Sequence, residues 1–256
     1  MIKPQSEHWV QIEESRRRVR VLFGGATIAD SKHVMLLREA QCLPVYYFPQ
    51  RDVHMDLMRP SSHTARCPYK GEASYWTLRV SGRAAENGAW SYFDPSTECA
   101  AIKNYVAFEW GKMDKWMEEE EEIFVHPRDP YKRVDVLLSS RHVRVLAGGE
   151  TVAETRRPRL LIETNHPVRY YVPREDVRME LLEPSATKSR CPYKGVASYW
   201  SVRIGERLFP DLVWSYQEPI PECPKVQGLF CFFQEREAVI YVDGEQIPAP
   251  RTKWAR

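Results

Sequence analysis

A ten-residue motif occurs twice in this sequence, and the duplication limits what the chain can fold into more than any other feature. Residues 67–76 read Cys-Pro-Tyr-Lys-Gly-Glu-Ala-Ser-Tyr-Trp, and residues 191–200 match them at nine of ten positions, 124 residues later. The same offset relates Tyr46 to Tyr170, and it also relates arginines, tryptophans and cysteines on both sides of the motif. Because the offset is constant, we predict a tandem duplication of one domain rather than a solenoid of short repeats.

Length and charge narrow the class of protein. The 256 residues give each copy roughly 120 residues, enough for a hydrophobic core of its own. The formal net charge is +2 and no long basic run is present, so nucleic-acid binding is not expected. No apolar run reaches the length of a membrane span, and residues 1–10 lack the apolar region of a secretory signal. We therefore expect a soluble, cytoplasmic protein without a nucleic-acid or membrane partner.

The six cysteines are expected to be reduced thiols, because none forms a Cys-x-x-Cys pair and no secretion signal is present. Disulfides within the repeats, Cys67 with Cys99 and Cys191 with Cys223, would suit the duplicated positions but are disfavoured for the same reason. No histidine recurs at the equivalent position of the other copy. Without repeated histidines or paired cysteines, we expect no metal site and no cofactor.

The hydrophobic pattern of each copy predicts a mainly β fold. Apolar and polar residues alternate along residues 19–23, a Gly-Gly turn follows, and the pattern returns at residues 27–29, which indicates a β-hairpin. Residues 143–153 repeat this arrangement in the second copy. Neither copy contains a segment with the pattern of a three-turn helix.

Five consecutive glutamates at residues 118–122 are interpreted as a solvated charged face or a linker between the copies. Residues 125–135 resemble their counterparts, residues 1–11, so little that we expect no equivalent in the first copy. This segment then either links the domains or completes one site only. The predicted boundaries are a polar lead-in at 1–15, a first domain at 16–116, an acidic linker at 117–132, a second domain at 133–250 and a tail at 251–256.

Several runs of the second copy resemble a known family. They are Tyr-Tyr-Val-Pro-Arg-Glu-Asp-Val at 170–177, Arg-Cys-Pro-Tyr-Lys-Gly at 190–195, Ala-Ser-Tyr-Trp at 197–200, Trp-Ser-Tyr at 214–216, and the His-Pro-Arg-Asp-Pro linker at 126–130. The chain resembles tandem members of the domain-of-unknown-function family numbered 427, which also carries the label nucleotidyltransferase. The first copy departs from the motif at Phe48, Gln50 and Arg51, so its site is less secure.

The resemblance implies two tandem copies of a β-tent (Mss4-like) domain, in which a pair of antiparallel sheets meet at an angle. Domains of that broad fold include zinc-bound, ligand-binding and redox proteins. The nucleotidyltransferase label has little support in the residues. The sequence has neither a Walker-type phosphate loop nor an Asp-x-Asp pair suited to two metal ions.

A lysine, a cysteine and a glutamate recur in both copies and could carry chemistry. Lys194 follows Cys191 by three residues in a loop that contains proline and glycine. A nearby ammonium group favours a thiolate, and a desolvated lysine can act as nucleophile or base. The alternative is structural, with Cys191 a small buried residue and Lys194 an ion-pair partner of Glu163 or Asp176. The candidate catalytic residues are Lys194, Cys191 and Glu163, with Lys70, Cys67 and Glu39 as their first-copy equivalents.

Recurring aromatic residues suggest a cleft for a small molecule. Tyr199 and Trp200 are adjacent on a predicted strand, so they face opposite sides and one of them could line a cleft. Aromatic walls bind flat or cationic ligands, although a core filled with aromatic rings would show the same pattern. The candidate ligand-binding residues are Tyr170, Tyr193, Trp200, Trp214, Arg190 and Asp176, with Tyr46, Trp76 and Trp90 in the first copy.

Two functions from different classes fit these residues. In the first, each copy, and the second above all, binds a small molecule in an aromatic cleft and is either a binding domain or an enzyme. Lys194 would be its base or anion clamp, Glu163 the acid that orients the lysine, and Trp200 or Trp214 the stacking wall. In the second, the domain is a protein-interaction or scaffold module and the polar residues form a structural network. Nucleotidyl transfer is a third reading, and it would require nucleotide and Mg²⁺ binding.

Overall fold

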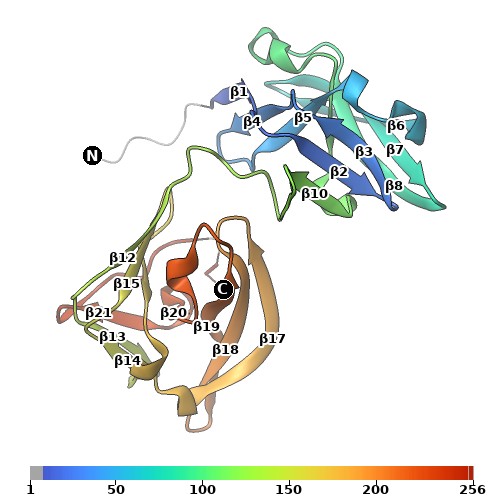
Figure 1. The fold of residues 1–256 in the computed structure, drawn as a ribbon. Coiled ribbons are helices and arrows are strands. Elements are labelled where there is room, and N and C mark those ends of the chain that lie inside the picture. Colours follow the sequence, from blue (N-terminus) through green and yellow to red (C-terminus); the bar gives the residue numbers. More distant parts are fainter. Residues whose placement is uncertain (1–7, 253, 256) are drawn as a thin grey trace. The chain divides into compact units, whose positions relative to one another are not determined.

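The computed structural model describes residues 8–252, 254 and 255. The chain divides into two compact units, Met1–Asp129 and Pro130–Arg256, called unit 1 and unit 2 below. Both consist of antiparallel sheets, and their helical segments are single short 3₁₀ turns (Figure 1). The prediction of a mainly β, tandemly duplicated chain is confirmed, while the β-tent assignment stays a prediction from the resemblance.

Unit 1 contains a seven-stranded and a four-stranded sheet. The larger has the order β1 (Val10–Glu14), β4 (Met35–Glu39), β5 (Val45–Pro49), β9 (Tyr105–Phe108), β8 (Arg83–Tyr92), β7 (Gly71–Val80) and β6 (Met58–Cys67). The smaller has the order β11 (Glu121–Ile123), β10 (Lys115–Glu118), β2 (Val19–Phe23) and β3 (Ala26–Ser31). The 3₁₀ turns are η1 (Gln50–Asp52), η2 (Met55–Leu57), η3 (Thr97–Ile102) and η4 (Trp110–Lys112).

Unit 2 repeats this arrangement. One sheet is β12 (Val134–Leu138), β15 (Arg159–Glu163) and β16 (Arg169–Tyr171), and another is β17 (Leu182–Cys191), β18 (Gly195–Ile204), β19 (Arg207–Pro219) and β20 (Phe230–Phe232). The third is β14 (Glu150–Thr155), β13 (Val143–Ala147), β21 (Val239–Val242) and β22 (Glu245–Gln246). The 3₁₀ turns are η5 (Arg174–Asp176), η6 (Met179–Leu181), η7 (Pro224–Val226) and η8 (Gln234–Arg236). A bridge between Val172 and Phe230 joins the first two sheets of unit 2. The equivalent residues of unit 1 belong to the paired strands β5 and β9, which is why unit 1 has one larger sheet there.

The predicted Gly-Gly hairpin is present as β2 and β3. Both turn residues have positive φ, +61° at Gly24 and +82° at Gly25, which side chains other than glycine rarely adopt. A Cβ on Gly24 would also lie only 2.9 Å from Val80. Buried and half-buried residues alternate along β2, so one face of this hairpin packs into the core.

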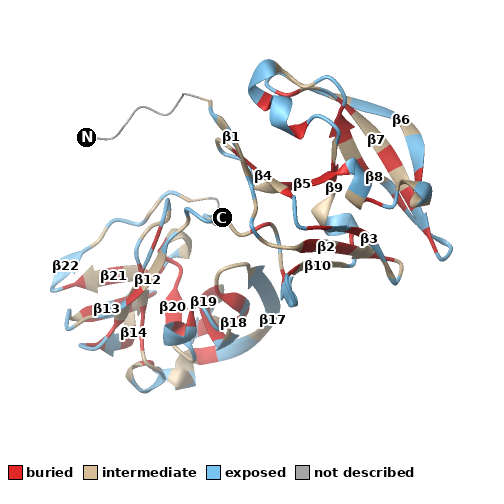
Figure 2. Ribbon diagram, turned by 45° about the horizontal axis from the view of Figure 1, so that its top comes forward, coloured by how far each residue is buried: buried red, intermediate tan, exposed pale blue. Residues whose placement is uncertain are grey.

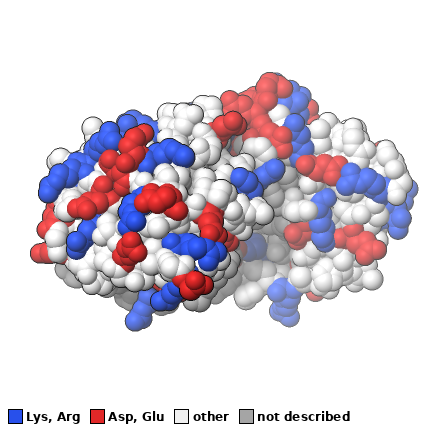
Figure 3. All heavy atoms as spheres, turned by 90° about the horizontal axis from the view of Figure 1, so that it is seen from below, with Lys and Arg blue, Asp and Glu red and all other residues white. Residues whose placement is uncertain are grey.

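Buried side chains run along the strands of each unit and form its core (Figure 2). Large aromatic residues fill much of this space, and Tyr47 and Tyr171 are each 1% exposed at equivalent positions. On the face shown in Figure 3, acidic and basic side chains intermingle apart from one acidic cluster at the top of the view. That distribution agrees with the small net charge of the sequence.

The end of this segment, residues 132–135, does have an equivalent in the first copy, contrary to the expectation from the sequence, while residues 1–7, the counterparts of 125–131, lie outside the described residues. Strand β12 pairs with β15 as β1 pairs with β4, and Val134 opposite Glu163 corresponds to Val10 opposite Glu39. The similarity was invisible because an outer strand is held by backbone hydrogen bonds, which place few demands on its side chains. The predicted lead-in at 1–15 therefore includes a strand.

The acidic run is part of unit 1 rather than a solvated linker. Strands β10 and β11 form a hairpin, and β10 pairs with β2. Glu118 is 3% exposed, accepts a 2.7 Å hydrogen bond from the hydroxyl of Tyr46, and lies 3.1 Å from Arg17 and 3.2 Å from Arg128. The other four glutamates, residues 119–122, are exposed as a solvated charged face would be, and Arg18 and Arg20 pair with Glu120.

Candidate functional site

The site is built around a buried ion pair in unit 2. Lys194 occupies the tight turn between β17 and β18, where its backbone N–H donates to the carbonyl of Cys191 at 3.4 Å. Gly195 completes the turn at φ +101°. Glu163 is the last residue of β15, and its Oε2 lies 2.5 Å from Lys194 Nζ. The two residues are 7% and 8% exposed, so the pair is almost fully removed from water.

A second ammonium group reaches the same carboxylate. Lys132 Nζ lies 2.9 Å from Glu163 Oε1 and 5.1 Å from the ring centroid of Tyr193. Strand register explains this approach, because Val134 is opposite Glu163 and Lys132, two residues earlier, lies on the same side of the strand. His166 Nδ1 is 3.9 Å from the same Oε1 and 3.5 Å from Lys132 Nζ.

Unit 1 carries the same arrangement with one change. Lys70 Nζ pairs with Glu39 Oε2, and the second cation is replaced by His8, whose Nε2 is 3.3 Å from Glu39 Oε1. The His8 ring stacks on Tyr69, as Lys132 lies over Tyr193 in unit 2. Sequence reasoning missed both residues. The signal was their 124-residue offset, which pairs a histidine with a lysine at each unit's entry.

The pair is charged at neutral pH. Burial lowers the pKa of Lys194, but the Cys191 thiol and the Glu163 carboxylate raise it further, and the net result is a pKa above the ordinary 10.5. Burial raises the pKa of Glu163, but Lys194 and Lys132 outweigh it, and the pKa falls below the ordinary 4.5. A protonated lysine is neither nucleophile nor base, so this geometry suits anion binding or proton donation.

The thiols near the pair are free. All six cysteines are unpaired, with Cys191 half-buried and Cys223 buried. Burial raises the pKa of the Cys223 thiol, although the Lys194 ammonium group opposes this effect. Its unit 1 equivalent, Cys99, is buried in the same way and its Sγ lies 3.8 Å from the carbonyl of Tyr69. Buried thiols with a raised pKa are protonated and act as small apolar residues.

The structure buries three of the seven candidate aromatic residues, Tyr46, Trp76 and Trp214, and leaves the other four half-buried. Trp214 is 7% exposed, and its Nε1 donates to the hydroxyl of Tyr171 at 3.1 Å. Trp90 makes the same hydrogen bond in unit 1, and Trp76 is also buried. Trp200 is half-buried and meets the Phe230 ring edge-on at 5.0 Å. These contacts explain the duplicated tryptophans by packing and place Trp214 in the core, while a stacking wall at half-buried Trp200 stays a prediction.

The remaining candidates divide between the ion pair and other places. Tyr193 and Cys191 flank Lys194 in the turn, and Arg190 is exposed one residue before Cys191. Asp176 instead accepts from the hydroxyl of Thr155 at 2.6 Å and from Arg157 at 3.1 Å. Lys194 therefore pairs with Glu163 and not with Asp176. Tyr170 is half-buried on β16, and its equivalent Tyr46 is the buried partner of Glu118.

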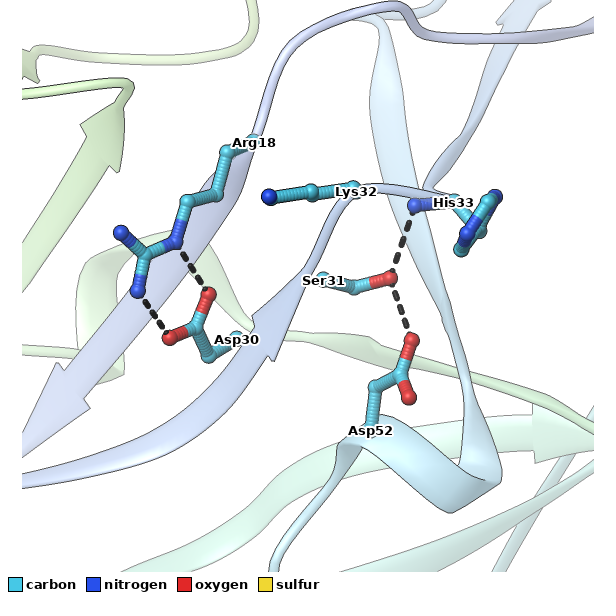
Figure 4. Close-up of a pocket in the computed structure, with 6 residues that line it drawn as sticks. All are labelled: Arg18, Asp30, Ser31, Lys32, His33 and Asp52. Carbon is cyan, nitrogen blue, oxygen red and sulfur yellow. Dashed lines mark hydrogen bonds and ion pairs between the residues drawn. The ribbon is translucent and has the colours of Figure 1, made fainter.

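A shallow depression of about 500 Å³ lies elsewhere on unit 1 (Figure 4). It contains Ser31, His33 and Asp52, but their roles are not those of a catalytic triad. The hydroxyl of Ser31 donates directly to Asp52 at 2.6 Å, and His33 contacts it only through a backbone N–H. The His33 ring faces Glu14 instead, at 3.0 Å. Asp52 is thus explained as a turn-stabilising residue.

Sequence reasoning also missed a buried ion pair that only unit 2 possesses. Arg169 Nη1 donates to Glu235 Oε2 at 2.9 Å, and the guanidinium carbon lies 5.4 Å from the Trp214 ring and 5.7 Å from the Trp254 ring. Valine and glycine occupy the equivalent positions of unit 1. Thr252 donates to Glu235 at 2.8 Å, so the described part of the predicted tail packs on unit 2.

Comparison with known proteins gives a family and no activity. A family model described as a domain of unknown function (DUF427) matches twice, over residues 11–119 and 135–243. The chain belongs to the DUF427 family. The model's name carries the nucleotidyltransferase label, and no curated protein matches the chain. Among the residues that the structure describes, none of the helices has the length and apolar character needed to span a membrane, and no three His, Cys, Asp or Glu side chains gather as metal ligands.

Proposed function

We propose that this DUF427 protein binds a small molecule at the lysine–glutamate centre of each unit, with unit 2 the more complete site. One observation carries the proposal. Both units place a carboxylate at the end of a strand, pair it with a lysine from a hairpin turn, and bring a second nitrogen base or cation to it across a tyrosine ring.

The energetics favour binding over a purely structural role. Burying two charges costs several kcal/mol of desolvation for each ion, and their attraction often does no more than repay it. An apolar pair would stabilise the same strand and turn at least as well. Two copies that both retain Lys and Glu, despite changes at most other positions, point to a use for the charges.

The state of the centre limits its chemistry. Because the pKa of Lys194 is raised, the lysine keeps its charge and acts as a clamp for an anion, and Glu163 holds it in place. Cys191 is half-buried beside it and is available to contact the same ligand. The free thiols suit the reducing cytoplasm, which we propose as the location of the protein.

A scaffold or protein-interaction module is the second candidate. The observation in its favour is the deep burial of Glu163 and Lys194, together with the packing of Trp214 in the core. In that case both charged residues serve only to fix the hairpin turn to the end of β15. Loss of either would destabilise the unit, and no ligand would be found.

A thermal-shift screen of metabolites, with Lys132→Gln as the test variant, separates the two. Lys132 is half-buried, so its loss leaves the fold intact while removing one arm of the site. Lys188→Gln is the matched control. Lys188 is exposed on the β17–β18 hairpin, which also carries Lys194, and its Nζ donates to Ser198 Oγ. Compounds that stabilise wild type and the Lys188 variant, but not the Lys132 variant, support the site. A screen without any stabilising compound favours the scaffold.

A further inference from the structure

One face of the β12–β15–β16 sheet in unit 2 is apolar and exposed. Residues alternate between the two faces of this sheet, and the strand register fixes which of them share a face. On one face Leu137 is 50% exposed and Ile162 is 42% exposed. This side, called the apolar face below, is made of Leu137, Leu160, Ile162 and Tyr170, and exposed Val168 directly precedes β16.

The equivalent face of unit 1, which includes Arg38 and Tyr46, is covered by its own chain. Both residues are buried. The hydroxyl of Tyr46 donates to Glu118 at 2.7 Å, and Arg128 lies 3.2 Å from the same glutamate. The next residue, Asp129, lies 3.6 Å from Arg38. The segment that follows β10 therefore folds back over this face of unit 1.

The corresponding segment of unit 2 packs on the opposite side of its sheet. Thr252 donates to Glu235 at 2.8 Å, and the centre of the Trp254 ring lies 5.7 Å from the guanidinium carbon of Arg169. Arg169 and Tyr170 are neighbours on β16, so their side chains point to opposite faces of the sheet. The contacts that cover this face in unit 1 are thus replaced in unit 2 by contacts on the other face.

The residue types on the two faces match this difference. Unit 1 has Glu13 and Arg38 at the positions where unit 2 has Leu137 and Ile162. Charged side chains suit a face that lies under a charged segment. Neighbouring exposed aliphatic side chains are instead typical of a surface that a partner covers. The apolar face therefore calls for a partner that is itself apolar at its centre.

Charged residues at both ends of the apolar face indicate which partner this is. At one end, Arg133 Nε lies 2.8 Å from Asp135. At the other end, Arg141 lies 4.0 Å from Asp243. Burial raises the pKa of Tyr170, and the charges of Arg141 and Asp243 also act on this pKa, which places both near the tyrosine. A rim with equal numbers of both signs complements a copy of itself, because a two-fold axis can bring each arginine to an aspartate of the other copy.

We propose that the apolar face of unit 2 is an interface between two copies of this chain, which pack these faces together across a two-fold axis. Leu137 and Ile162 form the centre, where burial of apolar surface stabilises the dimer, and the arginine–aspartate pairs form the rim. The interface is separate from the lysine–glutamate centre. Glu163 follows Ile162 on β15 and therefore points to the opposite face.

Sedimentation velocity of the full chain over a range of concentrations tests this proposal. We expect wild type to shift from the mass of one chain toward twice that mass as the concentration rises. Ile162→Arg introduces the residue that unit 1 has at this position, so the fold should tolerate it. It should weaken dimerisation about tenfold or more, because it places a charge at the centre of the interface.

Val196→Glu is the matched control. Val196 lies on β18, is 42% exposed like Ile162, and corresponds to Glu72 of unit 1. We expect this variant to dimerise as wild type does. Leu137→Glu, which introduces the residue of unit 1 at a second position of the apolar face, should weaken dimerisation in the same way as Ile162→Arg and decides the test if that variant does not fold.

Three results would overturn the proposal. The first is a wild type that stays a single chain at the highest concentration reached, even if another protein binds it. The second is a dimer that folded Ile162→Arg and Leu137→Glu variants leave intact. The third is a dimer that Val196→Glu weakens as much as they do, since the loss would then not be specific to the apolar face.

Discussion

Replacing Glu163 by glutamine is expected to cost unit 2 more stability than replacing its partner Lys194 by methionine. With glutamine at 163, the amide oxygen can still accept a hydrogen bond, but Lys194 remains a buried cation without an opposite charge, and breaking a buried ion pair in this way costs about 3–5 kcal/mol. Without Lys194, the carboxylate keeps Lys132 at 2.9 Å. The loss is then closer to that of one charge-assisted hydrogen bond, about 1.5–3 kcal/mol.

The double variant sharpens the comparison. Once Lys194 is methionine, the glutamine substitution leaves no buried cation in the turn, so the two losses should not add. We expect the double variant to be more stable than the sum of the single losses by about 1–3 kcal/mol. This coupling measures the pair itself rather than the packing of either side chain.

Guanidinium denaturation followed by hydrogen–deuterium exchange is the suitable assay, because peptides from unit 1 and unit 2 report separately and the two units need not unfold together. Unit 1 keeps its Lys70–Glu39 pair in all three variants and is the internal reference. Equal losses for the two single variants, or a fully additive double variant, would refute the reasoning that Lys132 is the second partner of Glu163.

Three further predictions follow from the same geometry. Because the pKa of Glu163 is lowered, its contribution to stability is present above pH 4.5 and is lost as the pH falls through the folded-state pKa. Because the pKa of Lys194 is raised, its contribution is present below pH 10.5 and is lost as the pH rises through the folded-state pKa. The difference in stability between wild type and the double variant should therefore not change with pH between these limits, and a slope near pH 7 would contradict this prediction. Gly195→Ala should destabilise unit 2 by about 1 kcal/mol or more, because φ is +101° and a Cβ would lie 3.3 Å from the carbonyl oxygen of Glu218; unchanged melting would contradict this strain. A thiol reagent followed by peptide mapping should label exposed Cys42 first and Cys231 last, because burial raises the pKa of Cys231 to about 12; early labelling of Cys231 would show that β20 opens easily.

Duplication made much of this fold predictable. The constant offset revealed two equivalent domains, and the alternation around the Gly-Gly turn at residues 24 and 25 placed the β2–β3 hairpin. The Lys194–Glu163 pair was also among the sequence-based alternatives, since both residues recur. These features were accessible because period and repetition survive in a single sequence.

Long-range partners were not accessible in the same way. Lys132 lies 61 residues before Tyr193 along the chain by their numbering, and only the folded arrangement of β12, β15 and the β17–β18 turn brings them together. Glu118 looked solvent-exposed within its charge run, because its partners are distant in the sequence, Tyr46 on β5 and Arg17 in the bend before β2. Periodicity also cannot tell a tryptophan in a cleft from one in a core, and Trp214 proved to be the latter.

Native mass spectrometry tests the central claim, that the lysine–glutamate centre is a binding site, most directly. Wild type, Lys132→Gln and Lys188→Gln would each be purified, incubated with a metabolite extract of the host cell and sprayed under native conditions. We predict a small-molecule adduct on wild type and on the Lys188 variant that is absent from the Lys132 variant. The same bare mass for all three, or an adduct that all three retain, would contradict the assignment of this centre as a ligand site.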